Sequence, residues 1–245
     1  MLLKDMIESQ GKWLFKRRGY IPLVFVPVLL TSLTKFEYPG GLHKYDLLWE
    51  MFTLSISLFG LVIRAYTIGY APSGTSGRHT KKQRATTLNT KGMYSVTRNP
   101  LYLGNFFAML GVAMFPRLWW IVVLYMAGFW LHYERVIAYE EDFLKEKFGE
   151  EYEEYCRKTP VFIPKFNLWK SPDTSFSFRR VLRKEYSSLF CLILAFLCME
   201  MISDYMVSRK IVFDPVWSVI FVITLILTGI IKVLKKYGKL LTEAG

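Results

Sequence analysis

The sequence predicts an all-α, polytopic membrane protein with about six transmembrane helices. Hydrophobic residues make up 52% of the 245 residues, and they occur in continuous blocks rather than in the alternation of a half-buried strand. Basic residues gather in every second connection between these blocks. The chain contains no internal repeat, and we expect residues 1–245 to form a single integral-membrane domain.

Six apolar blocks follow one another along the chain. Their limits are residues 20–33, 47–70, 101–115, 118–133, 187–207 and 215–234. The first block is short and contains Pro22 and Pro27, so we expect it to be kinked. The third and fourth are shorter than the roughly 20 residues that a perpendicular span needs. Thinning of the bilayer, or interfacial residues, would complete them. The last two blocks predict a C-terminal helical pair, residues 187–234.

The fourth block is expected to continue beyond the membrane as one helix. No Gly or Pro follows Gly128 until Gly149, which is a natural C-terminal stop. The whole helix would be about 45 Å long at 1.5 Å per residue. Beyond it, residues 151–157 are expected to form a short surface helix, and residues 175–184 an amphipathic surface helix.

The distribution of charge predicts the orientation of the chain. The net charge is +12, and the N-terminal segment, the second and fourth loops and the tail hold 26 of the 32 Lys and Arg residues. This alternation follows the positive-inside rule and places both termini in the cytosol. Arg64, near the end of the second block, is expected to extend its side chain to the interface. In a chain of this kind the basic excess favours anionic lipids as partners over nucleic acid.

Neither a metal site nor a disulfide framework is predicted. The three cysteines and three histidines show no spacing typical of metal ligands or of paired cysteines. Residues 72–77, P-S-G-T-S-G, are open to two interpretations. Their small residues could let backbone N–H groups cluster around an anion, or they could form an ordinary flexible loop.

A first motif crosses from a basic loop into the third block: G-M-Y-S-V-T-R-N-P-L-Y-L-G, residues 92–104. Pro100 suits the first turn of a helix, and Asn99 is a good N-cap residue. Arg98 would then lie at the membrane boundary beside the positive end of that helix. Tyr94 and Tyr102 add polar groups at the same boundary. The alternative is an ordinary capped helix start with an interfacial Arg/Tyr anchor.

A second motif spans residues 135–164 and contains R-V-I-A-Y-E-E-D-F-L-K-E-K-F-G-E-E-Y-E-E-Y, closing with P-V-F-I-P. Glu140 and Glu141 are adjacent, so on a helix they point about 100° apart and would rarely face one pocket. The alternative for this region is a solvated helix end with pairs such as Glu141–Lys145. We favour a functional role for Glu140 and a solvated role for the later glutamates.

Together the two motifs, over residues 85–165, resemble the isoprenylcysteine carboxyl methyltransferase and phospholipid methyltransferase superfamily. Members carry G-x-Y-x-x-x-R-H-P-x-Y-x-G, a helical hairpin, then R…E-E-x-x-L-x-x-x-F-G-x-x-Y-x-x-Y and P-x-x-I-P. Asn99 stands where most members have His, which is a clear departure. The chain also resembles a bacterial branch that includes a lipid A 1-phosphate methyltransferase.

The resemblance implies a methyltransferase that uses S-adenosylmethionine in a catalytic pocket on the cytosolic side of the membrane. It implies that Arg98 and Arg135 hold an anionic acceptor or the carboxylate of the cofactor. Arg135 lies five residues before Glu140, whereas the arginine of the family often lies four before it. The residues implied in cofactor binding are Thr87, Leu88, Asn89, Tyr94, Asn99, Tyr102, Glu140 and Glu141.

The acceptor is expected to be a lipid that enters from the bilayer. The amide of Asn99 cannot take a proton at neutral pH, so an acceptor that is already ionised, such as a phosphate or a carboxylate, is favoured. Our first hypothesis is O-methylation of the 1-phosphate of lipid A in a bacterial inner membrane. The alternatives are carboxyl methylation of a prenylcysteine, N-methylation of a phospholipid, and a non-catalytic lipid-binding scaffold.

Overall fold

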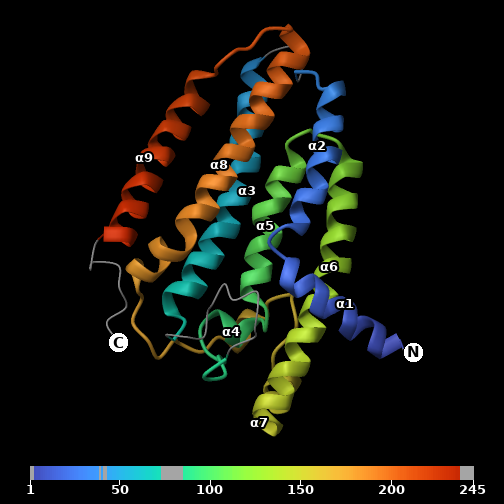
Figure 1. The fold of residues 1–245 in the computed structure, drawn as a ribbon, viewed down its shortest axis with the longest axis vertical. Coiled ribbons are helices and arrows are strands. Elements are labelled where there is room, and N and C mark those ends of the chain that lie inside the picture. Colours follow the sequence, from blue (N-terminus) through green and yellow to red (C-terminus); the bar gives the residue numbers. More distant parts are fainter. Residues whose placement is uncertain (1–2, 39, 41–42, 73–84, 238–245) are drawn as a thin grey trace.

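The computed structural model of the chain describes residues 3–38, 40, 43–72 and 85–237, and among these residues it contains helices and loops but no strand. Long helices run side by side along one axis, as Figure 1 shows. The segment 73–77, for which an anion-binding loop was one interpretation, lies outside the described residues. The fold is all-α, as the sequence predicts.

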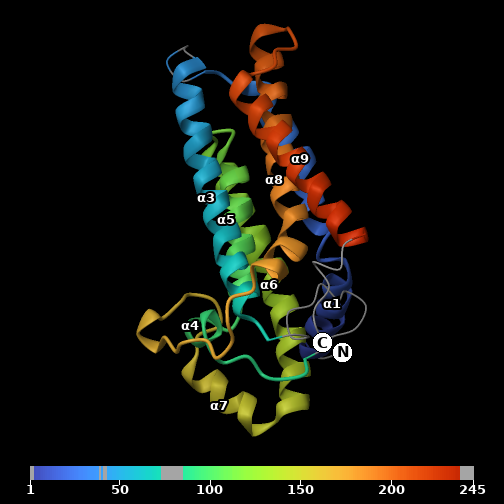
Figure 2. The same cartoon turned by 90° about the vertical axis from the view of Figure 1, so that its left-hand side faces the viewer.

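The helices α3, α5, α6 and α8 form the body of the bundle, and α9 packs against α8. We call the end that carries α4 and α7 the motif end, and the opposite end the far end (Figure 2). The helices and their bounds are α1 Leu3–Arg17, η1 Ile21–Phe25, α2 Val26–Ser32, η2 Leu33–Lys35, α3 His43–Tyr70, α4 Met93–Val96, α5 Pro100–Met114, α6 Trp119–Phe148, α7 Glu150–Lys158, η4 Phe166–Leu168, α8 Phe178–Ser208 and α9 Pro215–Tyr237.

Among the described residues, four helices, α3, α6, α8 and α9, are long and apolar enough to cross a membrane. The segment Leu23–Lys35 and helix α5 are apolar but shorter. The chain is therefore a polytopic membrane protein, and the count of six spans stays a prediction. The expected orientation also stays a prediction, although the first residues of α1 and the last of α9 lie toward the motif end (Figure 1).

Two local expectations are confirmed and one is wrong. Helix α6 runs unbroken for 30 residues to Phe148, and Gly149 ends it with a φ of 53° that favours glycine. Helix α7 is the short helix expected after it. Residues 175–184 form no separate surface helix. Residues 178–184 are instead the first residues of α8, which runs on without a break because no Gly or Pro interrupts the chain from Phe178 to Ser208.

Small residues bring α3 and α5 into close contact. A Cβ atom added to Gly111 would lie 2.1 Å from the carbonyl oxygen of Thr53, and one added to Gly60 would lie 2.3 Å from the amide nitrogen of Ala108. In the same groove, Ser57 Oγ donates a 2.8 Å hydrogen bond to the carbonyl oxygen of Ala108. Such close approach increases dispersion contacts, which hold helices together where lipid replaces water. This contact fixes the position of α5, whose first turn carries part of the first motif.

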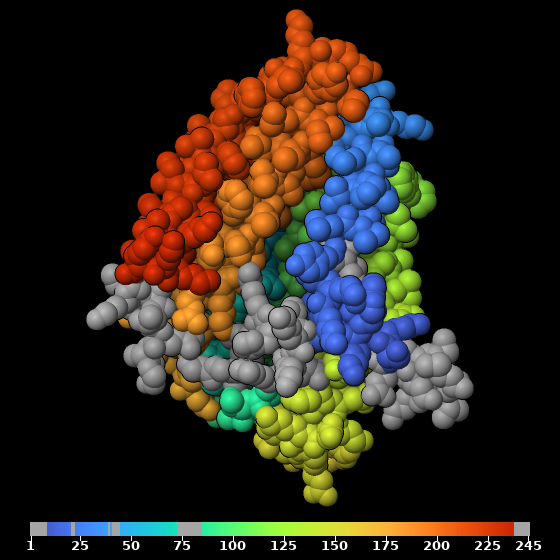
Figure 3. Space-filling view, in the orientation of Figure 1, coloured from blue at the N-terminus to red at the C-terminus, as the bar shows by residue number. Residues whose placement is uncertain are grey.

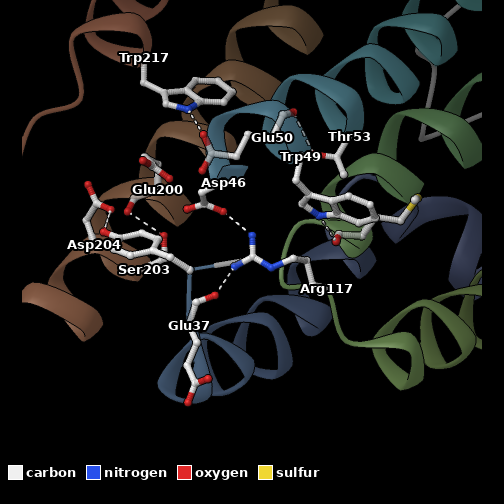
Figure 4. Close-up of polar contacts among 12 residues, drawn as sticks. Glu37, Asp46, Trp49, Glu50, Thr53, Arg117, Glu200, Ser203, Asp204 and Trp217 are labelled. Atoms are coloured by element: carbon white, nitrogen blue, oxygen red, sulfur yellow. Dashed lines mark hydrogen bonds and ion pairs between the residues drawn. The ribbon is translucent and has the colours of Figure 1, made fainter. Parts of the chain in front are cut away.

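A buried polar cluster joins the helices at the far end (Figure 4). Arg117 pairs with Asp46 and donates to the carbonyl oxygen of Glu37 at 2.6 Å. Trp217 Nε1 donates to Glu50 Oε2 at 2.7 Å, so the first turn of α9 is bonded to α3. Asp46, Glu50 and Glu200 each bring a carboxylate oxygen within 4.8 Å of the others. The cluster was not predicted, because its residues come from distant parts of the chain.

Candidate active site

A cavity of about 840 Å³ lies between the N-terminal helices, α5, α6 and α8. Figure 3 shows its hollow between α8, in orange, and α2, in blue, with α5 behind. At the motif end the cavity is lined by charged and polar side chains. Toward the far end it continues as an apolar arm lined by Leu23, Val26, Leu29, Met109, Val112, Leu192, Met199 and Ile202.

Nine of the ten site residues predicted from the sequence line this cavity. They are Thr87, Leu88, Asn89, Tyr94, Arg98, Asn99, Tyr102, Glu140 and Glu141. Arg135 is not among the lining residues, because it lies on the side of α6 that faces α1. Its Nε donates to Gln10 Oε1 at 2.8 Å, and its Nη1 donates to the carbonyl oxygen of Leu131 at 2.7 Å.

The closing segment of the second motif holds the first motif in place. The amide of Arg98 donates to the carbonyl oxygen of Pro160 at 2.9 Å, and the amide of Lys165 donates to that of Val96 at 2.9 Å. Thr97 Oγ1 donates to the carbonyl oxygen of Phe162 at 3.0 Å. These contacts across the chain fix the loop before α5, and with it the side chains that enter the cavity.

The side chain of Asn99 does not cap α5 as expected but bonds to the closing segment of the second motif. Asn99 is the residue before α5, and Pro100 occupies the first turn as predicted, but the Asn99 side chain makes no capping hydrogen bond. Instead, Asn99 Nδ2 donates to the carbonyl oxygen of Val161 at 3.0 Å. The side chain therefore ties the helix start to the closing segment and contributes to the cavity wall at the same time.

Glu140 accepts hydrogen bonds on both of its carboxylate oxygens. Arg18 Nη1 lies 2.8 Å from Glu140 Oε1, and Tyr102 Oη lies 2.9 Å from Glu140 Oε2. Arg18 Nη1 also donates to Tyr102 Oη at 3.2 Å. This arrangement brings α1, α5 and α6 together around one carboxylate, deep in the polar end of the cavity.

Glu141 pairs with the arginine of the first motif. Arg98 Nη2 lies 3.2 Å from Glu141 Oε1, and Arg98 Nε is buried with no hydrogen-bond partner in the described part of the chain. The expectation that Glu140 and Glu141 would rarely face one pocket is wrong here, because both residues line the same cavity. The alternative pair, Glu141 with Lys145, does not form, since Lys145 pairs with Glu153 on α7 at 2.8 Å.

A second polar group lies along the same wall and was not predicted. Arg64 donates to both oxygens of Glu185 on α8, and its Nη1 donates to Asn105 Oδ1 at 2.5 Å. Asn105 Nδ2 in turn donates to Tyr133 Oη at 3.0 Å. Arg64 thus does not extend to the interface as expected. A charged residue inside an apolar block was the available signal, because such residues usually have a buried partner.

Tyr94 and Tyr155, two tyrosines at the motif end, stay protonated. Burial raises the pKa of both Tyr94 and Tyr155 well above the usual value. The hydroxyl of Tyr155 donates to the carbonyl oxygen of Tyr94 at 2.7 Å, so it helps to fix α4 against α7. These hydroxyls can donate hydrogen bonds, but they do not supply a base at neutral pH.

A smaller pocket of about 240 Å³ adjoins the cavity. It lies between the end of α3 and the segment 87–94, and its walls include Tyr66 and Tyr70. The two spaces share Thr87, Leu88, Asn89 and Tyr94. Four of the eight residues that the family resemblance assigns to the cofactor therefore lie between a mixed aromatic and polar pocket and the large cavity.

Comparison with known proteins gives the family. Residues 51–151 match the family model of phospholipid methyltransferases. The chain is 32% identical over 168 residues to the cobalt-zinc-cadmium resistance protein CzcN of Cupriavidus metallidurans, which covers 68% of this chain and 73% of the relative. It is 29% identical over 163 residues to the nickel-cobalt-cadmium resistance protein NccN of Alcaligenes xylosoxydans, covering 66% of this chain and 71% of that protein.

A eukaryotic enzyme is also similar. The protein-S-isoprenylcysteine O-methyltransferase of Saccharomyces cerevisiae is 28% identical over 164 residues, covering 64% of this chain and 68% of the enzyme. No solved structure matches the chain. The motifs, the cavity that they line and these relatives agree, and the chain belongs to the isoprenylcysteine carboxyl methyltransferase and phospholipid methyltransferase superfamily.

Proposed function

We propose that the protein is an S-adenosylmethionine-dependent methyltransferase that O-methylates the anionic head group of a membrane lipid. The observation that carries the proposal is the joining of two environments in one cavity. Its polar end contains Glu140, Glu141 and Arg98, and its apolar arm runs between α2 and α8. A water-soluble cofactor suits the first environment, and the hydrocarbon chain of a lipid suits the second.

The polar end has side chains that fit the cofactor. S-adenosylmethionine carries a sulfonium and an ammonium group, and it supplies a methyl group on a leaving group that needs no protonation. Glu140 and Glu141 would attract these positive groups. Arg98, whose Nε is buried and makes no hydrogen bond with described residues, would hold a carboxylate. The residues would thereby orient the methyl donor toward the apolar arm and exclude water from it.

The residues at the site favour an acceptor that is already ionised. The amide of Asn99 cannot take a proton, and its Nδ2 is engaged with Val161. Buried Tyr94 and Tyr155 remain protonated. A phosphate or a carboxylate needs no base before it attacks a methyl group, whereas an ammonium head group must first lose a proton. We therefore place a lipid phosphate first, with the 1-phosphate of lipid A as the specific candidate, and a prenylcysteine carboxylate second.

Lipid analysis combined with matched variants tests this proposal. We expect membranes of cells that express the protein to contain a lipid heavier by one CH2 group than its counterpart in cells without the gene. Glu140→Gln should abolish the heavier species, because the acid between Arg18 and Tyr102 is lost. Glu151→Gln, an exposed position on α7, should leave it unchanged. The proposal fails if purified wild-type protein shows no binding of S-adenosylmethionine by calorimetry.

A role in metal tolerance is a second candidate, favoured by the two relatives named for resistance to divalent metals. A phosphate monoester carries about −1.5 to −2 charges at pH 7, because its second pKa is about 6. A methyl ester of that phosphate cannot make the second ionisation. Methylation would therefore reduce the attraction of the membrane surface for divalent cations.

Metal tolerance is tested in the same strains. We expect a strain that lacks the gene to be more sensitive to cobalt, zinc or cadmium, and wild-type protein but not Glu140→Gln to restore growth. Equal restoration by Glu140→Gln would show that metal tolerance does not depend on methyl transfer, and equal sensitivity of the strains with and without the gene would remove this second candidate.

A further inference from the structure

We propose that Arg18 binds the anionic head group of the acceptor, an inference that rests on the function proposed above. Arg18 follows the last residue of α1 and lies outside the segment matched by the family model. It lines the cavity at the point where the chain passes from α1 to the apolar arm, since Leu23 and Val26 of the following helices line that arm. A head group whose hydrocarbon chain occupies the arm would reach this guanidinium.

The position of Arg18 is fixed by close packing of α1 on α6. A Cβ atom added to Gly11 would lie 2.5 Å from the carbonyl oxygen of Arg135, so only glycine allows this approach. The ring of Phe15 packs edge-on against Tyr139 at 5.7 Å, and the Arg18 guanidinium lies 4.2 Å from the centre of the Phe15 ring. The guanidinium is therefore placed in the cavity by the fold.

Arg18 also keeps donors available for a ligand. Only its Nη1 makes hydrogen bonds with described residues, to Glu140 and Tyr102. Arg64, by contrast, uses Nε, Nη1 and Nη2 in bonds to Glu185 and Asn105. Arg98 already pairs with Glu141 through Nη2, and it is assigned above to the carboxylate of the cofactor. Among these three arginines, Arg18 best combines a position beside the arm with free donor groups.

Binding of the cofactor would favour binding of an anion by Arg18. In the structure the charge of Glu140 is balanced by Arg18 at 2.8 Å. A cationic cofactor that pairs with the Glu140 carboxylate would leave the charge of Arg18 without a counter-charge. Because Arg18 is largely buried, an unpaired charge there costs free energy. An anionic head group would restore the balance. The two ligands should then bind cooperatively, each strengthening the other by the same factor.

Calorimetry on the purified full-length protein in detergent tests the inference. The probes are S-adenosylmethionine, dodecyl phosphate, dodecanoate and uncharged dodecanol. We expect Arg18→Gln to weaken binding of dodecyl phosphate, dodecanoate or both by about ten- to a hundredfold, as for loss of a charge-assisted contact. Its affinity for S-adenosylmethionine should stay the same or rise, because Glu140 is released. Arg17→Gln, whose arginine lies 4.5 Å over the exposed Trp13 ring, is the matched control and should change neither.

The opposite pattern overturns the inference. If Arg18 only orients Glu140, Arg18→Gln will weaken S-adenosylmethionine and leave the anionic probes unchanged. If Arg18→Gln does not fold, Arg18→Lys takes its place, and it must still weaken the anionic probes severalfold while cofactor affinity is kept. Preference for dodecyl phosphate indicates a phosphate lipid, and preference for dodecanoate indicates a carboxylate acceptor. Absence of cofactor binding by the wild type would overturn the proposed function instead, since anion binding is measured without cofactor.

Discussion

Arg64 on α3 and Glu185 on α8 form a buried ion pair with two hydrogen bonds, Nε to Oε2 at 2.8 Å and Nη2 to Oε1 at 2.6 Å. The side chains are only 13% and 9% exposed, so the pair is shielded from solvent. We expect Glu185→Ala to lower the free energy of unfolding by about 3–5 kcal/mol, because it leaves a buried guanidinium without its partner. Thermal unfolding in detergent measures this loss.

The matched control removes both charges. Arg64→Met combined with Glu185→Leu should be much less destabilised than Glu185→Ala alone, because no unpaired charge remains. Equal stability of the wild type and Glu185→Ala would show that the pair does not hold α3 to α8.

The attachment of α9 should depend on Trp217. Its ring is fully buried, it stacks on Phe196 at 5.4 Å, and its Nε1 donates to Glu50. Trp217→Phe keeps an aromatic ring but leaves Glu50 Oε2 without this donor, so we expect a loss of about 1–3 kcal/mol in the free energy of unfolding. Val222→Ala, on the exposed face of α9, is the control and should change stability little.

The helices could largely be predicted from the sequence, because apolar blocks and helix stops are local signals. The run from Gly128 to Phe148 and the stop at Gly149 gave the length of α6, and both hold in the structure. Residues 175–184 were assigned wrongly, because their charge pattern was taken as a sign of a separate surface helix. In the structure residues 178–184 form the first turns of α8, where α8 packs beside α3, and residues 175–177 precede the helix.

The candidate site could be predicted only where its residues lie within the two motifs. Arg18 and Glu140 are 122 residues apart, and Arg64 and Glu185 are 121 apart, so no local spacing connects them. Arg135 was grouped with the site because it lies in the second motif. Its place on α6 turns it toward Gln10 instead, which shows that membership of a motif does not fix the direction of a side chain.

The contact between α3 and α5 should not tolerate a side chain at Gly111. A Cβ atom there would lie 2.2 Å from Ser57 Oγ and 2.1 Å from the carbonyl oxygen of Thr53, so the helices must separate. We expect Gly111→Val to destabilise the protein by at least the roughly 1–3 kcal/mol of ordinary overpacking. Gly128→Ala is the control, because a Cβ atom there meets nothing within 4 Å. A helical Gly→Ala change should raise stability by up to about 1 kcal/mol.

Asn99 should be replaceable by a residue that can donate a hydrogen bond to Val161. Asn99→Ala removes the 3.0 Å hydrogen bond, and we expect a loss of about 1 kcal/mol in the free energy of unfolding. Asn99→His introduces the residue that most members of the family have at this position; its ring N–H can donate in place of the amide, and it should recover most of that loss. Thermal unfolding compares the three proteins, and equal stability of the alanine variant would show that the contact contributes nothing.

Arg98 should be required as an arginine and not only as a positive charge. Its side chain is 12% exposed, its Nη2 lies 3.2 Å from Glu141, and its backbone amide is held by Pro160. A guanidinium can bind a carboxylate through two parallel bonds, whereas the ammonium of lysine cannot. We expect Arg98→Lys to lose about ten- to a hundredfold in methyl transfer while the protein still accumulates in the membrane. If Arg98 were only an anchor at the membrane boundary, lysine would substitute freely, and full transfer activity of Arg98→Lys would favour that role.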